Sequence, residues 1–166
     1  MLSKKMETAI NQQINQEIYS AHMYLAMSAY FSERNLNGFA HWMRIQYHEE
    51  LTHAERLVDY LLERNGNVAL GAIQKPTAMW KTTLAACQAA YKAEVKNTEQ
   101  INSLMDQAIK EHDHATRVIL QWFVEEQVEE EAQALNVVEQ VKMAQDSAAL
   151  FILDRELGAR TPEAGA

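Results

Sequence analysis

Residues 48–57 have the sequence HEELTHAERL. Glu50 and His53 stand three residues apart, so on an α-helix both side chains share one face. Leu57 continues that face one turn further on. A carboxylate on an apolar helix face is costly to bury unless a partner neutralises it. The stretch therefore predicts a helix that presents a pair of metal ligands to a helical core.

Four long segments share this helical periodicity, and turn-forming residues separate them. We expect helices over about residues 3–34, 38–64, 79–111 and 113–144. Asp146 or Ser147 is expected to cap a short fifth helix that ends at Leu157. The predicted fold class is all-α, a four-helix bundle with a short C-terminal fifth helix. One domain should span residues 1–158, and residues 159–166 should form a frayed tail.

The connection between the second and third helices decides the topology. It covers about residues 65–78, and a chain of that length can extend over roughly 45 Å at about 3.3 Å per residue. A helix of about 28 residues is roughly 42 Å long. The connection can therefore cross the whole bundle, which makes the second and third helices parallel. The other two connections are short and favour antiparallel neighbours.

Each of the other three helices carries a carboxylate on its apolar stripe: Glu17, Glu94 and Glu130. Glu17 precedes Glu50 by 33 residues, and Glu94 precedes Gln127 by the same interval. Oxygen ligands with one histidine suit iron or manganese.

This repeated spacing predicts two unequal metal positions. The first comprises Glu17, Glu50 and His53, with Gln127 as a hydrogen-bonding neighbour. The second comprises Glu50, Glu94 and Glu130, so that Glu50 bridges the two metals. The inequality arises because Gln127 and Glu130 stand where the first half of the chain has Glu50 and His53.

The composition narrows the class of function. The formal charge of −8 disfavours nucleic acid as a partner and favours cations. No run of about 18 apolar residues is present, so no membrane span is expected. The first thirteen residues lack the apolar core of a signal peptide, and Cys87 is the only cysteine. We therefore expect a cytoplasmic protein.

Three stretches together resemble bacterial non-haem ferritins: residues 15–28, 48–57 and 121–131, the last with the sequence QWFVEEQVEEE. The resemblance covers essentially the full length. It implies a ferritin-like bundle in a shell of twenty-four identical subunits that stores ferric oxyhydroxide. It also implies ferroxidase activity, in which a di-iron centre oxidises Fe(II) with O2 or hydrogen peroxide.

The same resemblance implies further roles for single residues. A third iron site maps onto Glu49, Glu126, Glu129 and Glu130. Tyr24 matches a tyrosine that assists electron transfer, although it is equally well explained as a packing residue. Leu51 stands where the haem-binding relatives carry methionine, so no haem is expected.

Two other functions are compatible with these residues. A di-iron oxidase or peroxidase without a storage shell would use the same ligands, and native mass separates it from a ferritin. A structural or partner-binding helical bundle would keep its function when Glu17 or Glu94 is replaced by alanine. Independently of these functions, Glu49, Glu126 and Glu129 are also compatible with ordinary solvated helix charges.

Overall fold

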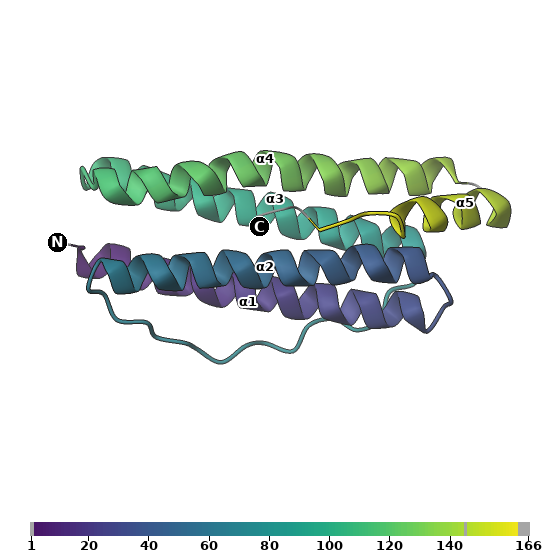
Figure 1. The fold of residues 1–166 in the computed structure, drawn as a ribbon, viewed down its shortest axis with the longest axis horizontal. Coiled ribbons are helices and arrows are strands. Elements are labelled where there is room, and N and C mark those ends of the chain that lie inside the picture. The colour runs from purple at the N-terminus through teal and green to yellow at the C-terminus, as the bar shows by residue number, and fades with distance from the viewer. Residues whose placement is uncertain (1, 145, 163–166) are drawn as a thin grey trace.

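The computed structural model describes residues 2–144 and 146–162. The regular secondary structure in this part of the chain is entirely helical: α1 Lys4–Ser32, α2 Asn37–Glu63, α3 Thr83–Lys110, α4 His114–Met143 and α5 Ser147–Leu157. The four long helices pack side by side, and α5 folds back against one end of them (Figure 1). The predicted all-α bundle with a short fifth helix is confirmed.

Polar side chains fix where the helices begin. Ser3, Thr82, Asp113 and Asp146 each accept a hydrogen bond from a backbone N–H in the first turn of α1, α3, α4 and α5. The expected start of the third helix at Met79 is wrong by four residues, because Thr82 is extended and caps Thr83 onward. The other helix ends lie within two residues of their expected positions.

Three residues just after helix ends lie in the left-handed region, Asn35, Asn65 and His112, with φ between 53° and 58°. Each follows a helix, where such a residue reverses the chain. The turn at Asn35 makes α1 and α2 antiparallel, and the turn at His112 does the same for α3 and α4.

The connection between α2 and α3, residues 64–82, runs the length of the bundle in an extended form, so these two helices are parallel (Figure 1). Asparagine side chains of α1 hold it. Asn11 Oδ1 accepts from Ala69 N at 2.6 Å, and Asn15 Oδ1 accepts from Gly71 N at 3.2 Å. These bonds supply partners for backbone that no helix satisfies.

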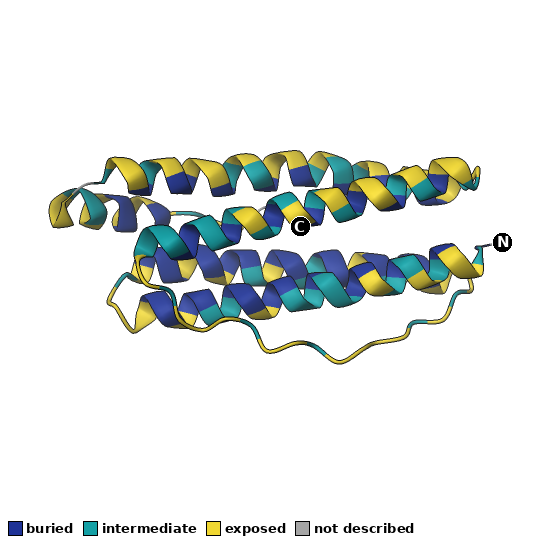
Figure 2. Cartoon of the chain, turned by 180° about the vertical axis from the view of Figure 1, so that it is seen from behind, coloured by how far each residue is buried: buried dark blue, intermediate teal, exposed yellow. Residues whose placement is uncertain are grey.

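The core consists of two apolar clusters rather than one. The first contains Phe31, Phe39 and Trp42 and lies toward the α5 end of the bundle. The second contains Ile10, Leu57 and other apolar side chains toward the opposite end. Buried faces line the inside of all four long helices (Figure 2). The polar middle of each stripe lies between the two clusters.

The fifth helix caps the second. The residue before α2, Leu36, makes no side-chain cap. Instead, Asp154 Oδ1 accepts from Gly38 N at 2.9 Å and from Phe39 N at 3.0 Å. A Cβ on residue 38 would lie 1.5 Å from the Asp154 carbonyl oxygen, so only glycine permits this approach.

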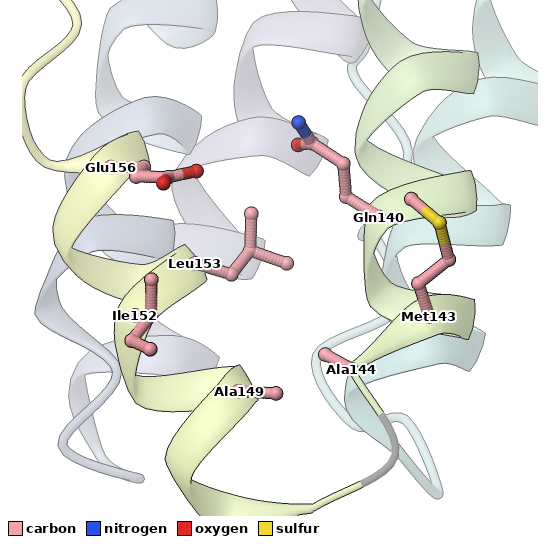
Figure 3. A pocket seen from close by; sticks show the side chains of 7 residues that line it. All are labelled: Gln140, Met143, Ala144, Ala149, Ile152, Leu153 and Glu156. Atoms are coloured by element: carbon pink, nitrogen blue, oxygen red, sulfur yellow. The ribbon is translucent and has the colours of Figure 1, made fainter.

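An apolar hollow opens between the end of α4 and α5 (Figure 3). Met143, Ala144, Ile152 and Leu153 line it, and Met143 and Ile152 are largely exposed. Phe151, also exposed, extends this apolar surface. None of the helices in the described ranges is both long and apolar enough to cross a membrane.

Replacing Asp154 with alanine should leave two N–H groups of α2 without their acceptor. We expect the free energy of unfolding to fall by roughly 1–2 kcal/mol, measured by chemical denaturation followed by circular dichroism. Asp154→Asn keeps an acceptor and should lose less. Glu156→Ala removes an exposed carboxyl group from the same helix and serves as the control. Equal losses in Asp154→Ala and Glu156→Ala would contradict the capping role.

Candidate metal centre

A belt of polar side chains crosses the middle of the bundle between the two apolar clusters. Each long helix contributes a buried carboxyl group: Glu17 from α1, Glu50 from α2, Glu94 from α3 and Glu130 from α4. None of the four is more than 4% exposed. The four carboxylates predicted from helical spacing to face inward are therefore buried in the structure.

Glu17, Glu50 and His53 form one group, in which one ligand atom from each residue lies within 4.8 Å of the others. His53 Nδ1 lies 3.8 Å from Glu50 Oε2. Glu50 Oε2 is buried and accepts no hydrogen bond from the described residues. A buried carboxylate oxygen of this kind needs compensation, and a divalent cation would provide it. These are the three residues predicted for the first metal position.

Amide side chains frame Glu17. Gln13 Nε2 donates to Glu17 Oε1 at 2.7 Å, and Asn97 Nδ2 donates to Glu17 Oε2 at 3.2 Å. Gln13 Nε2 also lies 2.6 Å from Asn97 Oδ1, which links α1 to α3. Asn97 further donates to Gln127 Oε1 at 3.3 Å. Both carboxylate oxygens of Glu17 are thus held in place.

Glu94 is held from two sides. The Tyr24 hydroxyl donates to Glu94 Oε1. Gln127 Nε2 lies 3.5 Å from Glu94 Oε2 and 3.3 Å from the Glu94 carbonyl oxygen. Gln127 was expected beside the first metal position. Through Asn97 it reaches Glu17, but its amide nitrogen faces Glu94, so it joins the two sides of the centre.

A second group of three possible ligands comprises His53, Glu126 and Glu130. Gln46 Nε2 donates to Glu130 Oε2 at 2.6 Å. The predicted second trio of Glu50, Glu94 and Glu130 does not form such a group within the described residues.

The residues expected at a third iron site are also not gathered. Glu49 is buried and pairs with Arg160, whose Nη2 lies 3.0 Å from Glu49 Oε2. Glu129 is exposed and accepts from Gln133 on its own helix. Of the four expected carboxylates, only Glu126 and Glu130 share a group.

Burial and mutual repulsion raise the pKa values of the carboxyl groups in the belt. Burial raises the pKa of Glu94 to about 7, although the hydrogen bond from Tyr24 opposes the rise. Burial, and then the nearby Glu94, raise the pKa values of Glu50 and Glu130 well above the usual range for a carboxyl group. Without metal the belt therefore retains protons near neutral pH, and a bound cation would displace them.

Several contributors to this centre were not predicted. Gln13 lies one helical turn before Glu17, so the spacing could have revealed it. Asn97 lies one turn after Glu94 and could have been found in the same way. Gln46 lies one turn before Glu50 and could also have been found from this spacing. Arg160 has no local signal, and its expected place in a frayed tail is wrong because it packs against α2. Residues 163–166 of that tail lie outside the described residues.

The chain matches the family model described as a ferritin-like domain over residues 7–144. It is 40% identical over 160 residues to a bacterial non-heme ferritin of Bacteroides fragilis, covering 96% of this chain and 100% of the relative. It is 33% identical over 162 residues to a bacterial non-heme ferritin of Staphylococcus aureus, covering 97% of this chain and 98% of the relative.

Solved structures agree with this match. An open pore ferritin of Archaeoglobus fulgidus is 47% identical with a TM-score of 0.96, covering 97% of this chain and all of the other. An engineered closed form of the ferritin from the same archaeon is 48% identical with a TM-score of 0.95, covering 97% and 99%.

Lowering the pH should stabilise the metal-free protein. Between about pH 4.5 and about 7, Glu94 binds more protons in the folded than in the unfolded state. The free energy of unfolding therefore falls as the pH rises through this window. Glu94→Gln should remove up to roughly 3 kcal/mol of that pH dependence. The measurement is chemical denaturation with chelator present across the window.

The exposed Glu99 lies on the same helix, so Glu99→Gln is the control and should unfold with the wild-type pH dependence. Parallel curves for wild type and Glu94→Gln would show that Glu94 ionises in the folded protein as it does in the unfolded chain.

Proposed function

Because the chain belongs to the ferritin family, we propose that its carboxylate belt oxidises Fe(II) and passes the ferric product to an iron store. The group formed by Glu17, Glu50 and His53 supports this most directly. Two carboxylates and one imidazole nitrogen are donors that suit Fe(II). When a cation displaces the proton from Glu50, the group carries a buried negative charge that the cation offsets.

The two iron ions would bind as unequal substrates. Glu17, Glu50 and His53 take the first, and the amides of Gln13 and Asn97 keep Glu17 oriented toward it. Glu50, Glu94 and Glu130 take the second. Glu94 can offer Oε2, because Oε1 accepts the Tyr24 hydroxyl and Gln127 approaches Oε2 only to 3.5 Å. A site with no histidine should hold iron less tightly, which suits a product that leaves.

Electrons and protons balance with the groups present. Each Fe(II) loses one electron, and the two electrons reduce O2 to hydrogen peroxide, or hydrogen peroxide to water, with uptake of two protons. Iron binding displaces protons from Glu50, Glu94 and Glu130, so protons become available in the belt. Burial, and then the adjacent Glu94, raise the pKa of Tyr24 well above its usual value. Tyr24 therefore orients Glu94 as a neutral donor, and its role in electron transfer stays a prediction.

Storage requires a closed assembly, and we propose a shell of twenty-four subunits enclosing ferric oxyhydroxide. The exposed apolar surface of α5 and the adjoining hollow support this proposal (Figure 3). Exposed Phe151 and Ile152 are poorly suited to contact with water and well suited to contact with copies of the chain.

Glu50→Gln should slow aerobic Fe(II) oxidation by at least about tenfold, since even neighbours of metal ligands commonly contribute that much. Stopped-flow absorbance of the ferric product measures the rate. The control is Glu99→Gln, which removes a carboxyl group from an exposed position and should match the wild type. If Glu50→Gln oxidised iron at the wild-type rate, the belt would not be the oxidation site.

Native mass spectrometry should find twenty-four subunits of 19.0 kDa each, and electron microscopy after aerobic iron loading should show dense cores. Replacing Phe151 and Ile152 together with serine should shift the protein toward smaller species while iron oxidation persists. Small oligomers of the wild type that still oxidise iron would indicate a non-storage di-iron oxidase or peroxidase instead.

A further inference from the structure

The chain that follows α5 returns to the iron centre. Asp154 anchors α5 on the first turn of α2, and Gly158 lies against Gly38. Residues 158–162 then lead along α2, where His41 Nε2 donates to the Arg160 carbonyl oxygen at 2.9 Å. The hydrogen bonds of Asp154 and of His41 therefore hold this segment against α2 and set the direction in which the Arg160 side chain points.

The Arg160 guanidinium group meets three side chains of α2, which lie one turn apart on one face. It lies over the Trp42 ring, 5.1 Å from the ring centroid. One of its nitrogens donates to Gln46 Oε1, and the other reaches both oxygens of Glu49 at 3.0 and 3.2 Å. The Arg160 side chain is only 15% exposed, and that of Glu49 is 7% exposed. The planar guanidinium group matches this set of acceptors.

Gln46 extends this contact into the belt. Its Oε1 accepts from Arg160 while its Nε2 donates to Glu130 Oε2 at 2.6 Å. Because Arg160 occupies the oxygen of this amide, the nitrogen is directed at Glu130. Arg160 therefore neutralises Glu49 directly and orients Glu130 through Gln46.

We propose that Arg160 gates the α2–α4 side of the iron centre, by occupying Glu49 so that a metal ion can reach this carboxylate only after residues 158–162 move away. The proposal rests on the proposed function, since it concerns iron that leaves the oxidation site. Arg160 is a positioning residue here, because its contacts are with Glu49 and Gln46.

Charge makes the two occupants mutually exclusive. The guanidinium group of Arg160 contacts both Glu49 oxygens and offsets their charge, and its own positive charge repels a second cation. If Arg160 is removed, the guanidinium charge no longer offsets the Glu49 carboxylate, which should then attract another cation. A merely structural ion pair predicts the opposite result, namely weaker packing of the segment with no added affinity for cations.

Binding of Co(II), a stand-in for Fe(II) that does not turn over, tests the gate in the assembled, metal-free protein. By isothermal titration calorimetry, Arg160→Gln should bind one more Co(II) per subunit than the wild type. Arg155→Gln removes the same charge from an exposed position on α5 and should bind the wild-type number. Arg160→Lys keeps a cation beside Glu49 and should also bind the wild-type number. An unchanged number in Arg160→Gln, or an equal gain in Arg155→Gln or Arg160→Lys, would overturn the gate.

Adding Glu49→Gln to Arg160→Gln should abolish the extra Co(II), because the carboxylate that receives it is gone. An extra Co(II) that persists in the double variant would place it elsewhere and overturn the proposal. Hydrogen exchange gives a readout on the unaltered chain. Excess Co(II) should accelerate exchange of the backbone amides at residues 159–161 in the wild type, as the segment is displaced. Unaltered exchange at every Co(II) concentration would contradict the gate.

The same titration separates this proposal from the function itself. Wild-type protein should bind Co(II) at the Glu17, Glu50 and His53 group, and Glu50→Gln should lose that binding. If this binding holds and Arg160→Gln gains nothing, only the gate fails. If wild-type protein binds no Co(II), the proposed function fails and the gate fails with it.

Discussion

The burial of four carboxyl groups at one level of a helical bundle is the constraint on which the rest of this structure depends. Each carboxylate costs free energy to remove from water, and each raises the cost of its neighbours. Without metal the belt compensates by retaining protons, since the pKa of Glu94 rises to about 7 and those of Glu50 and Glu130 rise well above their usual range. The apolar clusters on either side provide the packing that holds the belt closed.

The surrounding polar groups make the two halves of the belt unequal. Glu17 of α1 is held by the amides of Gln13 on the same helix and Asn97 on α3. Glu94 of α3 is held by the phenol of Tyr24 on α1 and the amide of Gln127 on α4. The first set keeps a ligand oriented toward a nearby histidine, whereas the second satisfies a carboxylate that has no histidine beside it. An unequal pair of positions suits iron that is bound, oxidised and released.

Helix α5 and residues 158–162 also contribute contacts to the belt. Asp154 caps α2, and this contact determines where α5 lies and where residues 158–162 run. Those residues place Arg160 against Glu49 and Gln46, within reach of Glu130 through one amide. The cap formed by Asp154 near one end of the bundle thereby places the Arg160 guanidinium group beside the polar belt.

The sequence by itself determined the four long helices, their connections and the residues that face inward, because helical spacing is a local property that a linear pattern records. It also identified Glu17, Glu50 and His53 as a group, since the side chains of Glu50 and His53 share one helix face and an equal interval separates the carboxylates in each half. Only the tertiary structure decided that Tyr24 and Gln127 hold Glu94, that Glu126 and not Glu94 joins His53 and Glu130, and that Arg160 occupies Glu49. Those contacts join residues up to 111 positions apart, and their geometry depends on how helices pack and on how α5 docks, which no local periodicity encodes.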